Sequence, residues 1–200
     1  LQTVTDAGGG VTTYFYDARS RITRQNQPNG MYATYQYDGR DRVTYIEYVL
    51  PEPMRVVVGF FDYDYDAAGN RTSAHEFTIG GTEAYLHWTY DATNRLTSET
   101  RTDSAQNPVS ATRYTYDPAD NRTAMTTNGR ETTYSYNVLD QLTTSTFNGA
   151  TITFSYDGRG NRSGVSDGAS YTANYSYDAL DRLLTVNTQN AANPLDIQTT

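Results

Sequence analysis

The chain has 200 residues, a formal net charge of −8, no cysteine and no lysine. The absence of cysteine excludes a disulfide framework and a thiolate zinc site, and the acidic balance disfavours non-specific binding to nucleic acid, which requires clustered cations. Only 36% of the residues are hydrophobic and 19 residues are tyrosines, so aromatic rings rather than aliphatic side chains must supply most of the buried area.

One aromatic motif recurs along the chain every 20 to 28 residues. Each copy has two aromatic residues that flank one other residue, and an aspartate follows in most copies. The aromatic pairs are Tyr14/Tyr16, Tyr35/Tyr37, Tyr63/Tyr65, Trp88/Tyr90, Tyr114/Tyr116, Tyr134/Tyr136, Phe154/Tyr156 and Tyr175/Tyr177. The aspartates are Asp17, Asp38, Asp66, Asp91, Asp117, Asp157 and Asp178. Such periodicity indicates a repeat architecture of eight units.

A polar return element follows each motif and comes in two forms. The short form places a long polar residue four positions after the acid, with an aliphatic residue next; these polar residues are Arg21, Arg42, Arg95, Gln141 and Arg182. We interpret the long form as an insertion of one residue, with asparagine before the arginine; its arginines are Arg71, Arg122 and Arg162. Because strand side chains alternate between faces, an insertion moves the arginine to the opposite face unless a bulge or a longer loop absorbs it.

A second turn lies between each return element and the next aromatic pair. Asn128-Gly129 and Asn148-Gly149 are strong hairpin signals, because both central residues of a type I′ turn require positive φ. Each repeat is therefore two strands and two turns. The sequence predicts an all-β protein, an antiparallel β-hairpin repeat array that occupies residues 1–200 as a single array and is a fragment of a longer chain.

Pairing outward from Asn128-Gly129 predicts the faces of one hairpin. Met125, Tyr134 and Tyr136 share one face, whereas Arg122 falls on the other. One face is then aromatic and the other polar, as a sheet that covers one core requires. The aspartate after each motif is expected to accept backbone N–H groups in an Asx-type turn, and the arginine is expected to pair with it or to lie on a neighbouring ring.

The iterated Tyr-x-Tyr-Asp motif with arginine past the turn resembles the YD repeat of the RHS (rearrangement hotspot) family, from about Tyr14 to Leu183. This family includes bacterial polymorphic toxins, the C components of insecticidal toxin complexes, wall-associated bacterial proteins and animal teneurins. The resemblance implies a sheet that spirals into a hollow shell or barrel, which encloses a toxic domain in the toxin members and belongs to an adhesion molecule in teneurins.

The chain departs from the family pattern in two places. Asn137 and Gln141 replace the acid and the arginine of the sixth copy, which is expected to weaken that turn. No terminator with the self-cleaving aspartyl site of the toxin members is found, so that site is not transferred to any residue. The sequence therefore nominates no catalytic residue and no cofactor.

The sequence contains two candidate metal sites. Asp62, Asp64 and Asp66 resemble the start of a calcium loop, but the glycine expected after the third acid is absent, and solvated edge acids are the alternative. His75 and His87 are expected near each other across the Gly80-Gly81 hairpin but on opposite faces, which disfavours ligation.

These observations lead to two hypotheses of function. The first is a structural segment of a secreted or surface-exposed bacterial RHS protein that encloses or presents another domain such as a toxin. The second is an extracellular adhesion or filament module that binds glycans or surfaces. Neither is an enzyme. The expected partners are flanking repeats of the same chain, an enclosed toxin domain or a surface glycan, and other copies through raw sheet edges; nucleic acid and a membrane span are not expected.

Overall fold

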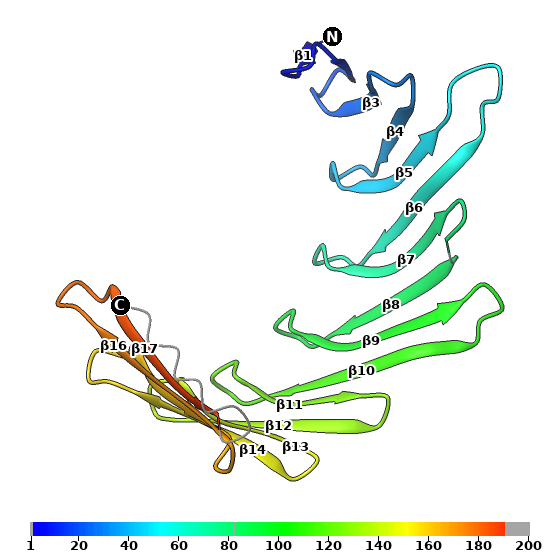
Figure 1. The fold of residues 1–200 in the computed structure, drawn as a ribbon. Helices are drawn as coiled ribbons and strands as arrows, with labels where there is room; N and C mark the ends of the chain where they lie inside the picture. The colour runs from blue at the N-terminus through cyan, green and yellow to red at the C-terminus, as the bar shows by residue number, and fades with distance from the viewer. Residues whose placement is uncertain (1, 82, 191–200) are drawn as a thin grey trace. The chain divides into compact units, whose positions relative to one another are not determined.

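A computed structural model describes residues 2–81 and 83–190 of the chain. It contains seventeen β-strands, and each strand pairs with the next along the chain (Figure 1). The described residues contain no helix, and therefore no helix that could cross a membrane. The predicted fold class, an antiparallel β-hairpin array, is confirmed.

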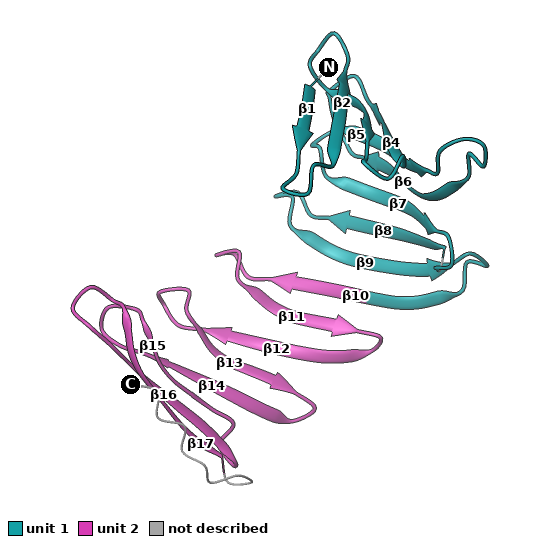
Figure 2. Cartoon of the chain, turned by 45° about the horizontal axis from the view of Figure 1, so that its top comes forward, with its two compact units in different colours: residues 1–111 teal, residues 112–200 magenta. Residues whose placement is uncertain are grey.

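The chain divides into two compact units, residues 1–111 and residues 112–200 (Figure 2). The first four motif copies belong to unit 1 and the last four to unit 2. The strands of unit 1 are β1 (Gln2–Thr5), β2 (Val11–Tyr16), β3 (Ile22–Asn26), β4 (Tyr32–Tyr37), β5 (Val43–Val49), β6 (Val57–Tyr65), β7 (Arg71–Thr78), β8 (Ala84–Tyr90) and β9 (Leu96–Asp103). Strand β10 (Pro108–Tyr116) crosses the boundary, and unit 2 continues with β11 (Arg122–Thr127), β12 (Arg130–Tyr136), β13 (Leu142–Phe147), β14 (Ala150–Tyr156), β15 (Arg162–Ser166), β16 (Tyr171–Tyr177) and β17 (Leu183–Asn190).

The second tyrosine of every motif ends an even-numbered strand, because the residues after it form a tight turn. In the first copy the backbone N–H of Asp17 donates to the carbonyl of Arg21 at 2.9 Å, and the N–H of Ser20 donates back to the carbonyl of Asp17. The turn position held by Ser20 has positive φ in all eight copies, where the other residues are Asp41, Gly69, Asn94, Asp120, Asp140, Gly160 and Asp181.

The hairpin register predicted around Asn128-Gly129 is confirmed where the structure defines it, since Thr127 pairs with Arg130 and Met125 with Thr132. The predicted face of Arg122 is wrong. A β-bulge between β10 and β11 pairs Thr115 with Ala124 but Tyr116 with Arg122, so Thr123 is the extra residue. The bulge restores Arg122 to the tyrosine face, and its guanidinium lies 4.6 Å from the centre of the Tyr134 ring.

The prediction that the long form contains an inserted residue is also wrong. Asp66 donates its backbone N–H to the carbonyl of Asn70, four residues on, as Asp17 does to Arg21. Both turns therefore have the same length, and the next residue pairs with the second tyrosine in each, Ile22 with Tyr16 and Arg71 with Tyr65. Asparagine replaces arginine at the fourth position after the acid, and arginine replaces the aliphatic residue at the fifth.

Equal turn lengths make a testable prediction for the fifth copy. Arg122→Leu is expected to change the free energy of unfolding by no more than about 1 kcal/mol, because Leu142 and Leu183 hold the same position in other copies. Deletion of Asn121, which the insertion hypothesis would tolerate, is expected to cost at least about 2 kcal/mol because it removes the carbonyl that closes the turn. Chemical denaturation of both variants checks this, and a deletion milder than the substitution would contradict it.

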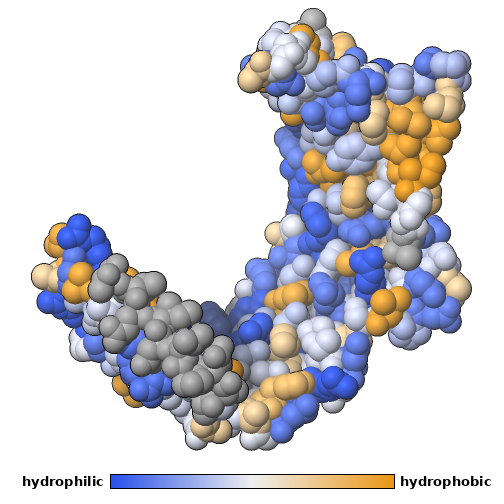
Figure 3. Space-filling model, in the orientation of Figure 1, coloured by the Kyte–Doolittle hydropathy of each residue, from blue (hydrophilic) through white to orange (hydrophobic). Residues whose placement is uncertain are grey.

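Burial is shallow, and the predicted alternation is present along β12 but not along the return strands β9, β11 and β13, whose side chains are nearly all half-buried. From Glu131 to Tyr136 the side chains of β12 alternate between exposed and half-buried, with both tyrosines half-buried. No large side chain among the described residues is fully buried, and the buried apolar residues are Ala33, Val49, Ala74, Ala84 and Ala173. Figure 3 shows a mixed surface on which one apolar patch lies over the β5–β6 hairpin. The aromatic rings therefore form a lining on one face of each unit and not an enclosed core.

Candidate functional site

The aspartate of each motif organises the turn that follows it. Asp17 Oδ1 accepts the backbone N–H groups of Arg19 at 2.8 Å and Arg21 at 3.0 Å, which is the expected Asx-type geometry. The backbone N–H of Arg21 is the largest influence that lowers the pKa of Asp17, followed by the guanidinium of the same residue. The pKa values of Asp38, Asp91 and Asp178 are also lowered. In each case the largest cause is the backbone N–H of the arginine four residues on.

The residue four positions after the acid joins its own turn to the next one. Arg21 Nε donates to Asp17 Oδ2 at 2.7 Å, while Arg21 Nη1 lies 2.7 Å from Asp41 Oδ1 in the following turn. Asparagine does the same in the other form, where it bonds its own aspartate and a side chain of the next turn. The turn-to-turn bonds of this kind are Asn70 to Asn94, Asn121 to Asp140 and Asn161 to Asp181, each at 2.8 Å.

The sixth copy keeps this geometry with uncharged side chains, so its turn has the hydrogen bonds but no ion pair, and the weakening of the turn stays a prediction. Asn137 Oδ1 accepts the N–H groups of Leu139 and Gln141, and Asn137 Nδ2 donates to Gln141 Oε1 at 2.8 Å. Gln141 Nε2 then reaches the carbonyl of Gly160 in the next turn at 3.3 Å.

Gly160 makes room for that side chain, which yields a second prediction. A Cβ at Gly160 would lie 3.2 Å from Gln141 Nε2, and the backbone there has φ +90°. Gly160→Ala is expected to cost about 1–2 kcal/mol of stability. Gly158→Ala in the same turn is the matched control, because its Cβ would meet nothing within 4 Å, and it should stay within about 0.5 kcal/mol of the parent. Urea titration distinguishes the two, and equal costs would refute the steric argument.

The second tyrosine of the motif makes a contact that sequence reasoning missed. Its hydroxyl donates to the carbonyl of the residue that begins the return strand of the preceding repeat, as Tyr37 does to Ile22 at 2.8 Å. The equivalent pairs are Tyr65 and Val43, Tyr90 and Arg71, Tyr136 and Arg122, Tyr156 and Leu142, and Tyr177 and Arg162. A signal was present, because the second aromatic is tyrosine in every copy, whereas Trp88 and Phe154 occupy the first position.

Arginines stack on the motif rings in two ways. At the fourth position, Arg21 lies 4.6 Å from the centre of the Tyr37 ring in the next copy. At the fifth position, Arg71 lies 4.0 Å from the Tyr63 ring of its own copy and 5.9 Å from the Trp88 ring of the next. Similar contacts join Arg42 to Tyr65, Arg122 to Tyr114 and Tyr134, and Arg162 to Phe154.

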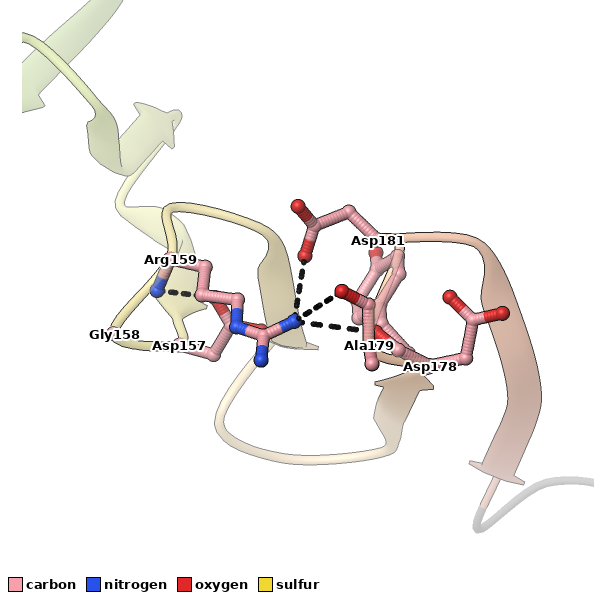
Figure 4. Close-up of a pocket in the computed structure, with 7 residues that line it drawn as sticks. Asp157, Gly158, Arg159, Asp178, Ala179 and Asp181 are labelled. Carbon is pink, nitrogen blue, oxygen red and sulfur yellow. Dashed lines mark hydrogen bonds and ion pairs between the residues drawn. The ribbon is translucent and has the colours of Figure 1, made fainter.

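A pocket at the turn edge of unit 2 also contains an arginine that joins two consecutive turns (Figure 4). Arg159 extends from one turn to the next, where Nη1 donates to the carbonyl of Ala179 at 3.0 Å and lies 3.5 Å from Asp181 Oδ1. Arg19 makes the corresponding ion pair with Asp41 in unit 1 at 2.9 Å. This pocket is therefore a junction between consecutive turns.

The structure does not assemble the candidate metal ligands. No group of three His, Cys, Asp or Glu side chains that could hold a metal occurs in the described part of the chain. Asp64 Oδ2 accepts the Ser73 hydroxyl at 2.7 Å, while Asp66 holds its turn, and Asp62 lies opposite His75.

The predicted opposite faces of the two histidines are wrong. His75 pairs with Tyr85 and His87 with Ser73, so both histidines lie on one face, in diagonal positions. The reason is the longer loop between β7 and β8, which shifts the register from that of a two-residue turn. His75 Nε2 lies 2.7 Å from Glu83 Oε1, and its ring stacks on Tyr85.

The geometry defines a class of protein: an all-β repeat scaffold whose recurring polar groups hold turns together and join each repeat to the next. The family model for the RHS Repeat matches residues 1–30 and 90–128. Over these two segments the chain is similar to RHS repeats.

Solved structures extend the likeness to nearly the whole chain. A TcdB2-TccC3 crystal structure without its hypervariable C-terminal region matches with a TM-score of 0.72 at 19% identity, over 88% of this chain and 10% of that one. A Photorhabdus luminescens Tc holotoxin pore with a mutated TccC3 matches with a TM-score of 0.61 at 18% identity, over 96% of this chain and 9% of that one. The chain thus spans about a tenth of the structures it matches. No curated protein matches in sequence.

Proposed function

We propose that this chain is a wall segment of a secreted or cell-surface bacterial RHS protein, and that the wall encloses or presents another domain such as a toxin. The observation that carries the proposal is the common face on which the motif rings of each unit lie. Apart from the exposed Tyr16, the motif rings line one face half-buried, and their hydroxyls and neighbouring arginines join each repeat to the next. The segment has no catalytic role in this proposal.

The lined face suits confinement of a polypeptide. Its rings offer apolar area for contact, while the hydrogen bonds between consecutive turns and from tyrosine to backbone oppose bending of one hairpin against the next. The partners are then flanking repeats of the same chain and the enclosed domain, with self-association of copies through sheet edges. Nucleic acid is not among the proposed partners.

Limited proteolysis of the full-length protein tests the enclosure. The enclosed domain should resist a protease that cuts the same domain when it is expressed alone. Phe154→Asp places a charge on the lined face and is expected to increase cleavage several-fold, whereas Ser155→Asp on the exposed face should leave the rate unchanged. Thermal melting of both variants establishes that they fold.

The result against the proposal is equal cleavage of the domain within the full-length protein and alone. If the full-length protein instead formed extended fibres that bound immobilised glycans, the adhesion hypothesis would replace enclosure.

A further inference from the structure

The face opposite the motif tyrosines carries hydroxyl groups in most repeats. Thr89 bonds Thr97 and Ser98 there, Thr115 bonds Thr123, and Ser176 bonds Thr185. In a repeat protein, features common to all copies maintain the scaffold, so a function specific to one place is sought where a copy differs. Strands β5 to β8 of unit 1 differ on this face.

These strands place five rings on the face opposite the motif tyrosines. We name these rings the outer aromatic patch; they are Tyr45, Phe60, His75, Phe77 and Tyr85. The register shows that they do not belong to the motif lining. Phe60 pairs with Phe77 and His75 with Tyr85, whereas the neighbouring Phe61 and Tyr63 point to the other side of the sheet.

The rings form a continuous row across four strands. Phe60 stacks on Tyr45 at 5.9 Å and on Phe77 at 5.6 Å, and meets the His75 ring edge-on at 4.8 Å between centres. His75 stacks on Tyr85 at 4.1 Å. All five side chains are half-buried, so each retains area that solvent can reach.

Carboxylates border this row. Glu47 lies directly opposite Phe60, and Asp62 lies opposite both Tyr45 and His75. Glu83 contacts His75 at 2.7 Å. The pKa of Tyr45 is raised, first by burial and then by the charges of Glu47 and Asp62, in agreement with their position beside its ring.

No arginine within strands β5 to β8 balances these charges on the same face. Arg71 is the one arginine in strands β5 to β8, and its guanidinium lies over the Tyr63 ring on the motif face. The outer aromatic patch therefore combines ring area with negative charge, whereas a nucleic acid or an anionic membrane would be repelled by it.

We propose that the outer aromatic patch is a docking surface for an arginine-containing basic segment of a partner protein. A guanidinium can lie on a ring and pair with a flanking carboxylate at once, and its planar form suits both contacts better than an ammonium. The chain itself forms this arrangement, since Arg21 pairs with Asp17 and lies over Tyr37. The proposal does not depend on what the lined face encloses.

Binding of synthetic peptides to the purified chain, measured by fluorescence anisotropy, tests the proposal. The probes are an arginine-serine peptide, the same peptide with lysine, the same peptide with glutamate, and a neutral oligosaccharide. The arginine peptide should bind saturably and at least about three-fold more tightly than the lysine peptide. The glutamate peptide and the oligosaccharide should not bind.

Variants locate the site. The double variant Glu47→Gln/Asp62→Asn is expected to weaken binding of the arginine peptide about ten-fold. Glu131→Gln, on the exposed face of β12 in unit 2, is the matched control and should leave binding unchanged. Phe60→Thr introduces the residue type found on this face in other repeats and should also weaken binding, in a protein that still melts cooperatively.

Three outcomes would overturn the proposal. They are equal loss of affinity in the double variant and in the control, equal affinity for arginine and lysine peptides, or binding of the oligosaccharide in place of the basic peptides.

Discussion

Replacing Tyr136 by alanine is expected to lower the free energy of unfolding by about 3 kcal/mol. The ring is half-buried on the lined face of β12, so the loss of packing falls below that of a fully enclosed aromatic residue. The variant also loses the hydrogen bond from the Tyr136 hydroxyl to the carbonyl of Arg122, which is 2.9 Å long and joins two repeats.

Two further variants separate these contributions. Tyr136→Phe keeps the ring and removes the hydroxyl, and it should cost about 1 kcal/mol. Ser135→Ala is the control on the exposed face of the same strand and should stay within about 0.5 kcal/mol of the parent. Chemical denaturation gives all three values. A Tyr136→Phe cost near zero would show that the contact between repeats does not stabilise the fold.

Lowering the pH below about 5 is expected to destabilise the protein progressively, down to about pH 2. The turn aspartates Asp17, Asp38, Asp91 and Asp178 have pKa values below the ordinary value of 3.8, chiefly because of the backbone N–H of the arginine four residues on. A carboxyl whose pKa is lower in the folded state stabilises that state fully above its unfolded pKa. The stabilisation is lost as the pH falls through the folded pKa.

The melting temperature measured from pH 7 to pH 2 checks this expectation. The acid-induced loss should be smaller in Asp91→Asn, which removes one titrating group. It should be larger in Asn137→Asp/Gln141→Arg, which gives the sixth turn the charged pair that four other copies have. A melting temperature that does not change between pH 5 and pH 2 would show that the turn carboxylates do not stabilise the fold.

Much of the candidate site was predictable because its contacts are local. Asp17, Arg19 and Arg21 lie within five residues, so composition and spacing were enough to predict the Asx-type turn and the pairing of the acid with the arginine. The docking surface proposed on β5 to β8 was not predictable in this way. It depends on the register of four strands, which brings Tyr45, Phe60 and His75 into one row.

The amino-acid sequence by itself determined the number of repeats, the strand and turn of each copy, and the pairing around Asn128-Gly129, since these follow from short-range spacing and turn chemistry. Only the tertiary structure decided the face of Arg122, the partner of each second tyrosine hydroxyl and the common face of His75 and His87. The physical reason is that a bulge or a longer loop reverses the alternation of side chains downstream of it, and a hydroxyl that bonds the backbone of the preceding repeat has no signature within its own.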